Sequence, residues 1–247
     1  MTNGYNHQIH AGNAGDVWKH FILVEVAEHL FFRDRSLVYA ESHVGRPEYA
    51  LGAPGEWEKG IGRLWRHLPS LGDFLYFRIL ADLNPQGLRL YPGSSSLVLE
   101  TAKRLGALVQ AEIWDINPEL SAFWQGYSQV RFHLADGFSG VASILDRSNP
   151  GLLLIDPPYL DAKDNALARD LLLKAEEAGW IVLWWHMSGL ETIPPDITEL
   201  ELVFSRAGMD GGKWKGSAVS LAGADEYLIE SLRCKAEKLI IALQNDL

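Results

Sequence analysis

The chain has 247 residues, of which 47% are hydrophobic, so it can bury a sizeable core and is not expected to be disordered. Its single cysteine, Cys234, excludes an internal disulfide and a zinc site with four thiolate ligands. The formal net charge of −10 weighs against a nucleic-acid partner, because clustered Lys and Arg side chains usually make the phosphate contacts.

The N-terminal segment is rich in polar side chains, and the pattern over residues 16–30 predicts a helix with a solvated face. Histidines and an acid near one another raise the question of a metal site: His7, His10, Asp16 and His20. Their spacing matches no recognised set of metal ligands, so we expect no bound metal.

The body of the chain alternates short aliphatic runs with amphipathic segments, which predicts a largely parallel sheet covered by helices. Residues 47–110, between the first two strands, form a stretch too long for an unstructured loop in a compact domain. We therefore expect a small helical insertion at about 48–109, with at least two helices. The five predicted strands are 37–41, 111–115, 130–136, 152–156 and 181–186.

Two further strands are predicted at residues 201–204 and 217–221. The Gly-rich connection between them is too short for a crossover helix, so the pair is expected to be antiparallel. Beyond Asp225, leucines recur at helical spacing and predict a terminal amphipathic helix packed on the core. Residues 1–247 are thus expected to form one α/β domain with a seven-stranded, mostly parallel sheet.

The strongest chemical signal is Asp156-Pro157-Pro158-Tyr159, which ends a buried apolar strand. Two prolines cannot continue a ladder of hydrogen bonds, so the chain must leave the sheet at the edge where open α/β folds bind ligands. An adenine amine is a poor nucleophile because its lone pair is delocalised into the ring. The carboxylate of Asp156 and the carbonyl of Pro157 would hold such an amine, and Tyr159 would stack on its base. The alternative is an ordinary exit into a turn.

Acidic residues also end other predicted strands. Asp115 stands where nucleotide-binding folds hold ribose hydroxyls, although it also suits the N-cap of the following helix. Asp136 would meet the adenine of a nucleoside cofactor, with Gly137 allowing close approach of the backbone; the alternative is an Asp-Gly turn. The segment from Glu41 to Gly45 ends the first strand, where the methionine end of such a cofactor would lie.

Three motifs occur in order along the chain: His10-Ala-Gly-Asn-Ala-Gly-Asp-Val-Trp-Lys-His20, Tyr91-Pro-Gly-Ser94 and Asp156-Pro-Pro-Tyr159. Together they resemble the RlmJ family of bacterial 23S ribosomal RNA adenine-N6 methyltransferases, earlier connected with the use of external DNA. The resemblance extends from Tyr5 to about His186 and becomes loose beyond Gly212. It implies a Rossmann-like class I fold that uses S-adenosylmethionine to methylate the N6 amine of an adenine.

The resemblance also implies roles by position. Asp156 is similar to the family's catalytic residue, with Pro157 and Tyr159 beside it. Residues 1–20 resemble a tail that caps the substrate, and Tyr5, His7 and Lys19 would contact the target nucleotide. The cofactor contacts would be His20, His43, Ser94, Asp115, Asp136 and Gly137. Ser94 follows a Pro-Gly turn, so we expect its hydroxyl to point outward, or else to stabilise the turn.

The chain departs from the family's pattern at Arg46-Pro47, which replaces a second glycine, and at Asp115, which replaces a longer Glu. Its end beyond Gly208 is shorter and divergent. Two alternatives stay open. One is the same fold acting on DNA adenine or a protein glutamine amide. The other is a nucleic-acid-binding relative that has lost the cofactor through Arg46-Pro47.

The expected partner is 23S ribosomal RNA, naked or in an early assembly intermediate, and the expected oligomeric state is a monomer. Local basic clusters are present at Arg63, Arg66 and His67, and at Lys213 and Lys215. No apolar run approaches the roughly 18 residues that would span a membrane, and the first residues show no signal-peptide pattern. We therefore expect a cytoplasmic protein with no membrane partner.

Overall fold

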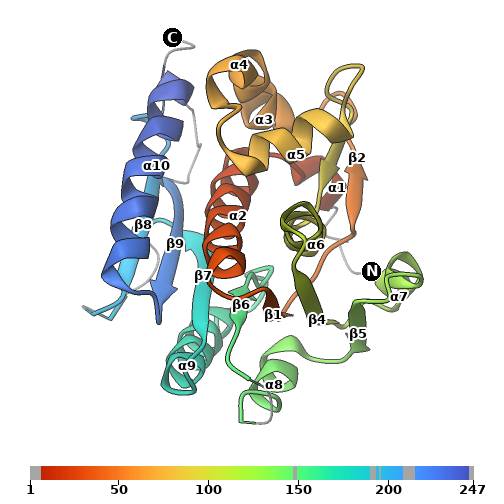
Figure 1. Cartoon of the computed structure of the whole chain (residues 1–247), viewed down its shortest axis with the longest axis vertical. Helices are drawn as coiled ribbons and strands as arrows, with labels where there is room; N and C mark the ends of the chain where they lie inside the picture. Colours follow the sequence, from red (N-terminus) through yellow and green to blue (C-terminus); the bar gives the residue numbers. More distant parts are fainter. Residues whose placement is uncertain (1–6, 147–148, 190–192, 195, 208–214, 245–247) are drawn as a thin grey trace.

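A central sheet organises the computed structural model, which describes residues 7–146, 149–189, 193–194, 196–207 and 215–244. The seven strands of this sheet are β1 (Ser36–Glu41), β4 (Leu108–Asp115), β5 (Val130–Leu134), β6 (Leu152–Ile155), β7 (Ile181–Met187), β8 (Thr198–Val203) and β9 (Gly216–Ala222). Their order is β5-β4-β1-β6-β7-β9-β8, with helices on both faces (Figure 1). The expected Rossmann-like fold with a seven-stranded sheet is confirmed.

Five neighbouring strands, from β5 to β7, run parallel, whereas β9 is antiparallel to both β7 and β8. The predicted antiparallel pair near the C-terminus is therefore confirmed. The parallel strands bring their carboxyl ends to one edge of the sheet. Strand β5 ends at Leu134, two residues before the predicted end, because Asp136 turns away to cap the next helix.

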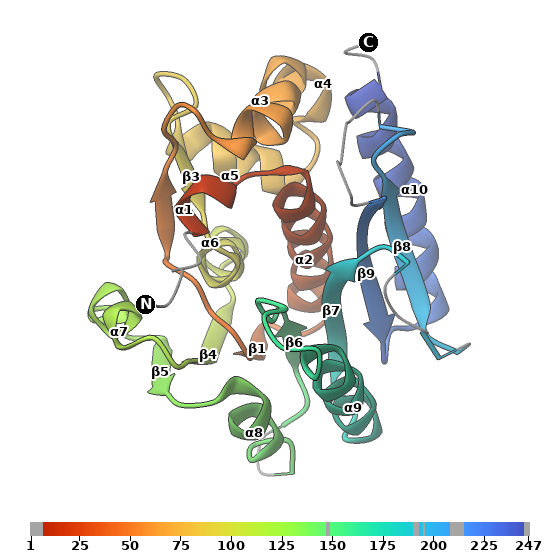
Figure 2. The same cartoon turned by 180° about the vertical axis from the view of Figure 1, so that it is seen from behind.

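Each face of the sheet has its own apolar core. On one face lie α2 (Ala14–Arg33), α6 (Ser94–Leu105) and α10 (Glu226–Gln244); on the other lie α8 (Gly137–Ala142) and α9 (Asp164–Glu177) (Figures 1 and 2). Tyr39 joins the first core and Ala40 the second, since neighbouring strand residues point to opposite faces. The predicted terminal helix is confirmed as α10, with Leu228, Leu232, Leu239 and Leu243 buried.

Helix α2 is buried along most of its length, so the predicted solvated face is wrong. Every residue from Gly15 to Ala27 is buried, because the helix packs against the sheet and is covered by α6, α10 and α5 (Leu75–Leu83). The helix begins after Asn13, whose side chain accepts a hydrogen bond from the Asp16 backbone at 2.9 Å. Its first turns lie at the carboxyl edge of the sheet, because α2 leads directly into β1.

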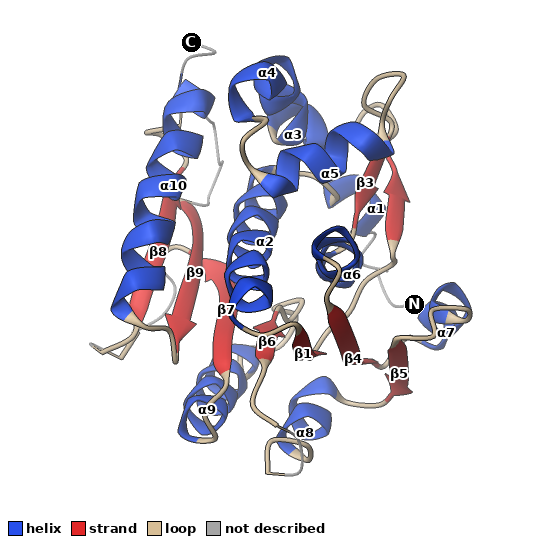
Figure 3. Cartoon of the chain, in the orientation of Figure 1, coloured by secondary structure: helices blue, strands red, loops and turns tan. Residues whose placement is uncertain are grey.

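A small lobe lies between β1 and α6. It contains α3 (Ile61–Leu64), α4 (Leu68–Leu71), α5, two 3-10 turns (Glu56–Lys59 and Trp65–His67), and the antiparallel pair β2 (Glu48–Ala50) and β3 (Leu90–Pro92) (Figure 3). The sequence did not predict this strand pair, because strands so short leave no periodic pattern. Arg63 donates to the carbonyls of Ala207 and Leu243, so part of the expected basic cluster ties the lobe to the C-terminal region.

Two further short helices complete the fold: α1 (His7–His10) before α2, and α7 (Pro118–Trp124), which packs against β5. Helix α7 is capped by Asn117, which accepts a hydrogen bond from Glu119, with Pro118 in the first turn. No helix among the described residues combines the length and the apolar character that a membrane span requires.

Candidate active site

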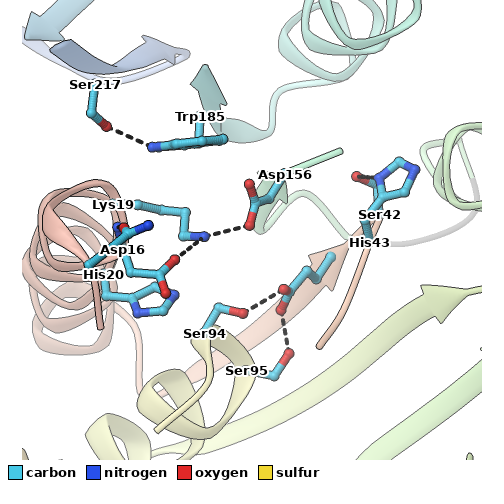
Figure 4. A network of polar contacts seen from close by, with 12 residues as sticks. Asp16, Lys19, His20, Ser42, His43, Ser94, Ser95, Asp156, Trp185 and Ser217 are labelled. Atoms are coloured by element: carbon cyan, nitrogen blue, oxygen red, sulfur yellow. Dashed lines mark hydrogen bonds and ion pairs between the residues drawn. The ribbon is translucent and has the colours of Figure 1, made fainter. Parts of the chain in front are cut away.

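Asp156 follows β6 directly, and the chain leaves the sheet there, as the two prolines predict. Its Oδ2 accepts a hydrogen bond from Lys19 Nζ at 2.5 Å, and Nζ also lies 3.0 Å from Asp16 Oδ1 (Figure 4). Lys19 is 4% exposed. Burial works against its charge, but Asp156 and Asp16 raise the pKa of Lys19 above its usual value. The ammonium is therefore held between two carboxylates.

Asp16 is the member of this cluster that the sequence interpretation considered only as a metal ligand and did not connect with Asp156. Its Oδ2 accepts a hydrogen bond from the Gly12 N–H at 3.0 Å, which fixes the carboxylate at the start of α2. Its spacing of three from Lys19 puts both side chains on one helix face, and that spacing was the signal available. The part of the expected capping tail from Ala14 onward is instead the buried beginning of α2.

Tyr159 is held in place by the neighbouring strand β7. Its hydroxyl donates to the carbonyl of Trp185 and accepts a hydrogen bond from Trp184 Nε1 at 2.8 Å. Its φ of 54° lies in the left-handed region, which is uncommon for a residue other than glycine. Pro157 is buried and Tyr159 is partly buried, so the tetrapeptide forms a turn with little freedom at the edge of the sheet.

A buried carboxylate, Glu41, ends β1. It is 1% exposed and accepts hydrogen bonds from Tyr39 Oη at 2.8 Å, Ser94 Oγ at 2.5 Å and Ser95 Oγ at 2.5 Å. Burial raises the pKa of Glu41 to about 7, against the opposing effect of these three donors. The expectation that the Ser94 hydroxyl points outward is wrong, because the start of α6 packs against the end of β1 and turns this hydroxyl inward.

His20 also faces inward from α2. Its Nδ1 lies 3.0 Å from Tyr91 Oη, which in turn lies 2.9 Å from Tyr76 Oη. The rings of His20 and Tyr91 stack with 5.6 Å between their centroids. The Tyr91-Pro-Gly-Ser94 motif thus meets the N-terminal motif in space.

His43 lies at the turn after β1. Its Nδ1 is 2.8 Å from Ser42 Oγ, and its ring meets that of Phe138 edge to face at 4.7 Å between centroids. Burial lowers the pKa of His43, while the carboxylates of Asp156 and Asp136 act in the opposite direction. The residue therefore lies within electrostatic reach of both acids, between the ends of β6 and β5.

Asp115 is the last residue of β4, and Asp136 follows the end of β5. Asp115 Oδ1 accepts a hydrogen bond from the Asn117 N–H at 2.7 Å, and burial raises the pKa of Asp115. Asn117, and not Asp115, is the N-cap of the next helix. Asp136 does cap its helix: Oδ1 accepts hydrogen bonds from Ser139 N at 2.8 Å and Oγ at 2.7 Å, and the backbone bond lowers the pKa of Asp136.

Gly137 marks a very close approach between α8 and the end of β1. A Cβ atom at this position would lie 1.5 Å from the carbonyl oxygen of Ser42, so only glycine fits without movement of the backbone. The close approach at Gly137 is to the turn that carries His43, whereas the approach predicted from the sequence was to the cofactor.

Of the other residues singled out in the sequence, Tyr5 and Lys213 lie outside the described residues, and His7 begins α1. Arg46 stacks its guanidinium on the ring of Phe123, with 4.7 Å between Cζ and the ring centroid. Its backbone N–H donates to Tyr49 Oη at 2.7 Å. The residue that replaces a family glycine therefore directs its side chain toward α7.

The carboxylate of Asp156, which holds the Lys19 ammonium, lies at the same sheet edge as the ends of β1, β4 and β5. Asp156 thus already holds one N–H donor, and the acids of these three strands line the same edge. Among the described residues, no group of His, Cys, Asp and Glu side chains is placed to hold a metal ion.

Comparison with known proteins finds one family and close relatives within it. A family model described as "Ribosomal RNA large subunit methyltransferase D, RlmJ" matches residues 34–206, a stretch that includes Asp156 but not α2 up to Arg33. The ribosomal RNA large subunit methyltransferase J of Haemophilus influenzae is 33% identical over 186 residues, which cover 71% of this chain and 65% of that protein. Its counterpart in Escherichia coli is 34% identical over 165 residues, 63% and 59% of the two chains.

The matched part thus spans somewhat less than two thirds of either relative. Among solved structures, a Legionella pneumophila protein assigned to family DUF519 superposes with a TM-score of 0.81. The superposition covers 95% of this chain and 94% of that one, at 20% sequence identity. At this identity the likeness shows that the two chains share a fold.

Proposed function

Because this chain belongs to the family of ribosomal RNA large subunit methyltransferases described as RlmJ, we propose that it methylates 23S ribosomal RNA at the N6 amine of an adenine, with S-adenosylmethionine as the methyl donor. The observation that carries the proposal is the place of Asp156, at the carboxyl end of β6 and next to β1 in the sheet. An amine held there lies beside the strand ends at which open α/β folds bind nucleoside cofactors.

The side chains at these strand ends fit such a cofactor. Asp115 would hold the ribose hydroxyls: the Asn117 N–H engages one of its oxygens, and a carboxylate has room for further donors. Ile116, which follows it, is 75% exposed and offers apolar surface to a purine ring. The other cofactor contacts that we propose are His20, His43, Ser94, Asp136 and Gly137.

When bound, S-adenosylmethionine supplies a methyl group on a sulfonium sulfur. Asp156 Oδ2 and the carbonyl of Pro157 accept hydrogen bonds from the two amine N–H groups, which favours a pyramidal nitrogen with its lone pair available. On transfer the amine would gain the methyl group as its bond to sulfur breaks, with S-adenosylhomocysteine as the leaving group. The amine would lose one proton, which Asp156 Oδ2 would accept and return to solvent. Positioning and fixed hydrogen-bond acceptors supply most of the acceleration.

Lys19 has to give up its bond to Asp156 when the amine arrives. Its ammonium now donates to the same Oδ2 atom that the amine requires. We assign Lys19 to the target nucleotide, together with Tyr5 and His7 near the N-terminus. A lysine that moves from a carboxylate to a phosphate or base oxygen exchanges one charge-assisted hydrogen bond for another.

Ribosomal RNA as the substrate is supported by the names of the relatives and by the family match. The net charge of −10 makes the choice of acceptor the part of the proposal that most needs a direct test. The test is incubation of the purified chain with methyl-labelled S-adenosylmethionine and deproteinised 23S ribosomal RNA, followed by mass spectrometry of the nucleosides.

The expected product is N6-methyladenosine, with at least about 100-fold less formed by Asp156→Asn. Parallel incubations contain DNA or a peptide-release factor. If label appears in DNA adenine or in a glutamine amide and none appears in RNA, the methyl acceptor is DNA or protein, and the proposed RNA acceptor is wrong. Failure to transfer label, with no heat of binding for S-adenosylhomocysteine in calorimetry, would identify a relative that has lost the cofactor.

A further inference from the structure

Trp185 lies beside the Lys19–Asp156 ion pair and has no part in the chemistry described above. It stands on β7, next to β6, and its side chain is partly exposed. Lys19 Nζ lies 5.3 Å from the centroid of its ring. In Figure 4 the ring is seen nearly edge-on, with the Lys19 ammonium and the Asp156 carboxylate on the same side of it. One face of an aromatic ring therefore borders the place where the amine is to be held.

The ring of Trp185 is fixed by its neighbours. Its Nε1 donates to Ser217 Oγ on β9 at 2.8 Å. The ring of Tyr159 packs on it, with 5.9 Å between centroids and a tilt of 52°. Gly15 leaves room for it, because a Cβ there would lie 3.2 Å from Trp185 Cζ2. A ring held in this way loses little conformational freedom when a base stacks on it.

The Lys19 ammonium marks the space that the target base would enter. It is an N–H donor held between the Asp156 carboxylate and the indole ring. An adenine amine is also an N–H donor, and it is bonded directly to a flat ring. An amine that takes the place of Nζ at Asp156 Oδ2 thus brings its purine up to the indole.

The two hydrogen-bond acceptors at the site do not by themselves select adenine. Cytosine carries the same kind of conjugated exocyclic amine, and Asp156 and Pro157 would hold it equally well. Selection must come from the rest of the base. A flat, rigid indole overlaps the two rings of a purine more than the single ring of a pyrimidine, so stacking favours the purine.

Resting on the function proposed above, we propose that Trp185 is the stacking wall of the target-base pocket and sets its preference for a purine. The ligand is one unstacked purine of single-stranded or rotated-out nucleic acid. Asp156 and Pro157 recognise the amine, and Trp185 recognises the size of the ring that bears it. The entering base displaces the Lys19 ammonium from the indole face.

The kinetic test compares Trp185→Leu, Trp185→Phe and Ser217→Ala with the wild type on deproteinised 23S ribosomal RNA. Trp185→Leu is expected to raise KM for the RNA about tenfold or more, the loss typical of a base–aromatic stack. Trp185→Phe keeps a flat ring and is expected to recover most of that loss. Ser217→Ala keeps the indole but removes the hydrogen bond that helps to fix it, and it is expected to raise KM less than Trp185→Leu does. Calorimetric affinity for S-adenosylhomocysteine should be unchanged in all three.

A second readout follows base stacking without methyl transfer. The chain has 9 tryptophans, so the emission of Trp185 is taken as the difference between the wild type and Trp185→Phe, both saturated with S-adenosylhomocysteine. Adenosine monophosphate is expected to quench this difference emission more strongly than cytidine monophosphate. A residue with a purely structural role would show no such preference.

The outcomes separate the two proposals. If the wild type transfers methyl groups but Trp185→Leu keeps its KM for RNA, or if both nucleotides quench alike, the inference on Trp185 is overturned and the proposed function stands. Joint loss of RNA and S-adenosylhomocysteine affinity in Trp185→Leu assigns the ring a structural role and also overturns the inference. A wild type that neither transfers methyl groups nor binds S-adenosylhomocysteine overturns the proposed function, and the role of Trp185 with it.

Discussion

The ammonium of Lys19 lies 2.5 Å from a carboxylate oxygen of Asp156, although 137 positions separate the two residues in the chain. The contact joins the first turns of α2 to the end of β6. It places a buried cation at the atom that the proposed mechanism assigns to the substrate amine, and that mechanism therefore requires Lys19 to move when the substrate binds.

Asp156→Asn keeps the shape of the side chain and removes its charge. We expect methyl transfer to fall about 100-fold or more, because the neutral amide oxygen is a weaker acceptor than the carboxylate and cannot take up the amine proton. S-adenosylhomocysteine affinity should stay close to that of the wild type. Asp161→Asn, an exposed acid in the same loop, is the control and should keep full activity. Undiminished turnover of Asp156→Asn would remove the mechanism.

Lys19→Met leaves Asp16 and Asp156 without their shared cation. Breaking a buried ion pair in this way should lower the free energy of unfolding by about 3 kcal/mol, measured by urea denaturation. Lys235→Met is the matched control, since Lys235 pairs with buried Glu25 far from the strand ends. Lys235→Met should also lower the free energy of unfolding, but the rate of methyl transfer per folded molecule should stay that of the wild type. Equal effects of both variants on transfer would contradict a substrate role for Lys19.

Glu41 predicts a pH dependence of stability. Its pKa is raised from 4.5 to about 7 on folding, so the folded chain binds this proton more tightly than the unfolded chain. The contribution to stability is fully present below the unfolded pKa of 4.5 and is lost as pH rises through about 7. Glu41→Gln should therefore lose less stability than the wild type between about pH 5 and about pH 7.5, by denaturant titration. Parallel pH profiles for the two proteins would refute this.

Gly137→Ala should displace the start of α8 or the turn after β1, because the new Cβ would meet the Ser42 carbonyl at 1.5 Å. We expect a loss of about 2 kcal/mol or more in stability and weaker S-adenosylhomocysteine binding, measured by thermal denaturation and calorimetry. Gly52→Ala is the control, since its Cβ would meet nothing within 4 Å. A Gly137→Ala variant as stable as Gly52→Ala would show that this approach can relax at no cost.

Local sequence patterns were enough to predict the strands of the sheet and the turn at Asp156. The aliphatic run that stops at Asp156 predicted the strand before it, because a strand buried on both faces is apolar throughout. Two prolines after Asp156 predicted the exit at the sheet edge, because proline cannot donate to a ladder. These features depend on residues that are close together in the chain, so they can be predicted from the sequence.

The burial of α2, the inward hydroxyl of Ser94 and the position of Trp185 were decided by tertiary structure alone. Trp18 of α2 donates to the carbonyl of Leu200, 182 positions away, and Ser94 reaches Glu41 across 53 positions. A helix that looks half-polar in sequence is buried when distant elements supply partners for its polar side chains. The direction of each polar group was set by which remote partner packed against it, and periodicity along the chain carries no information about that partner.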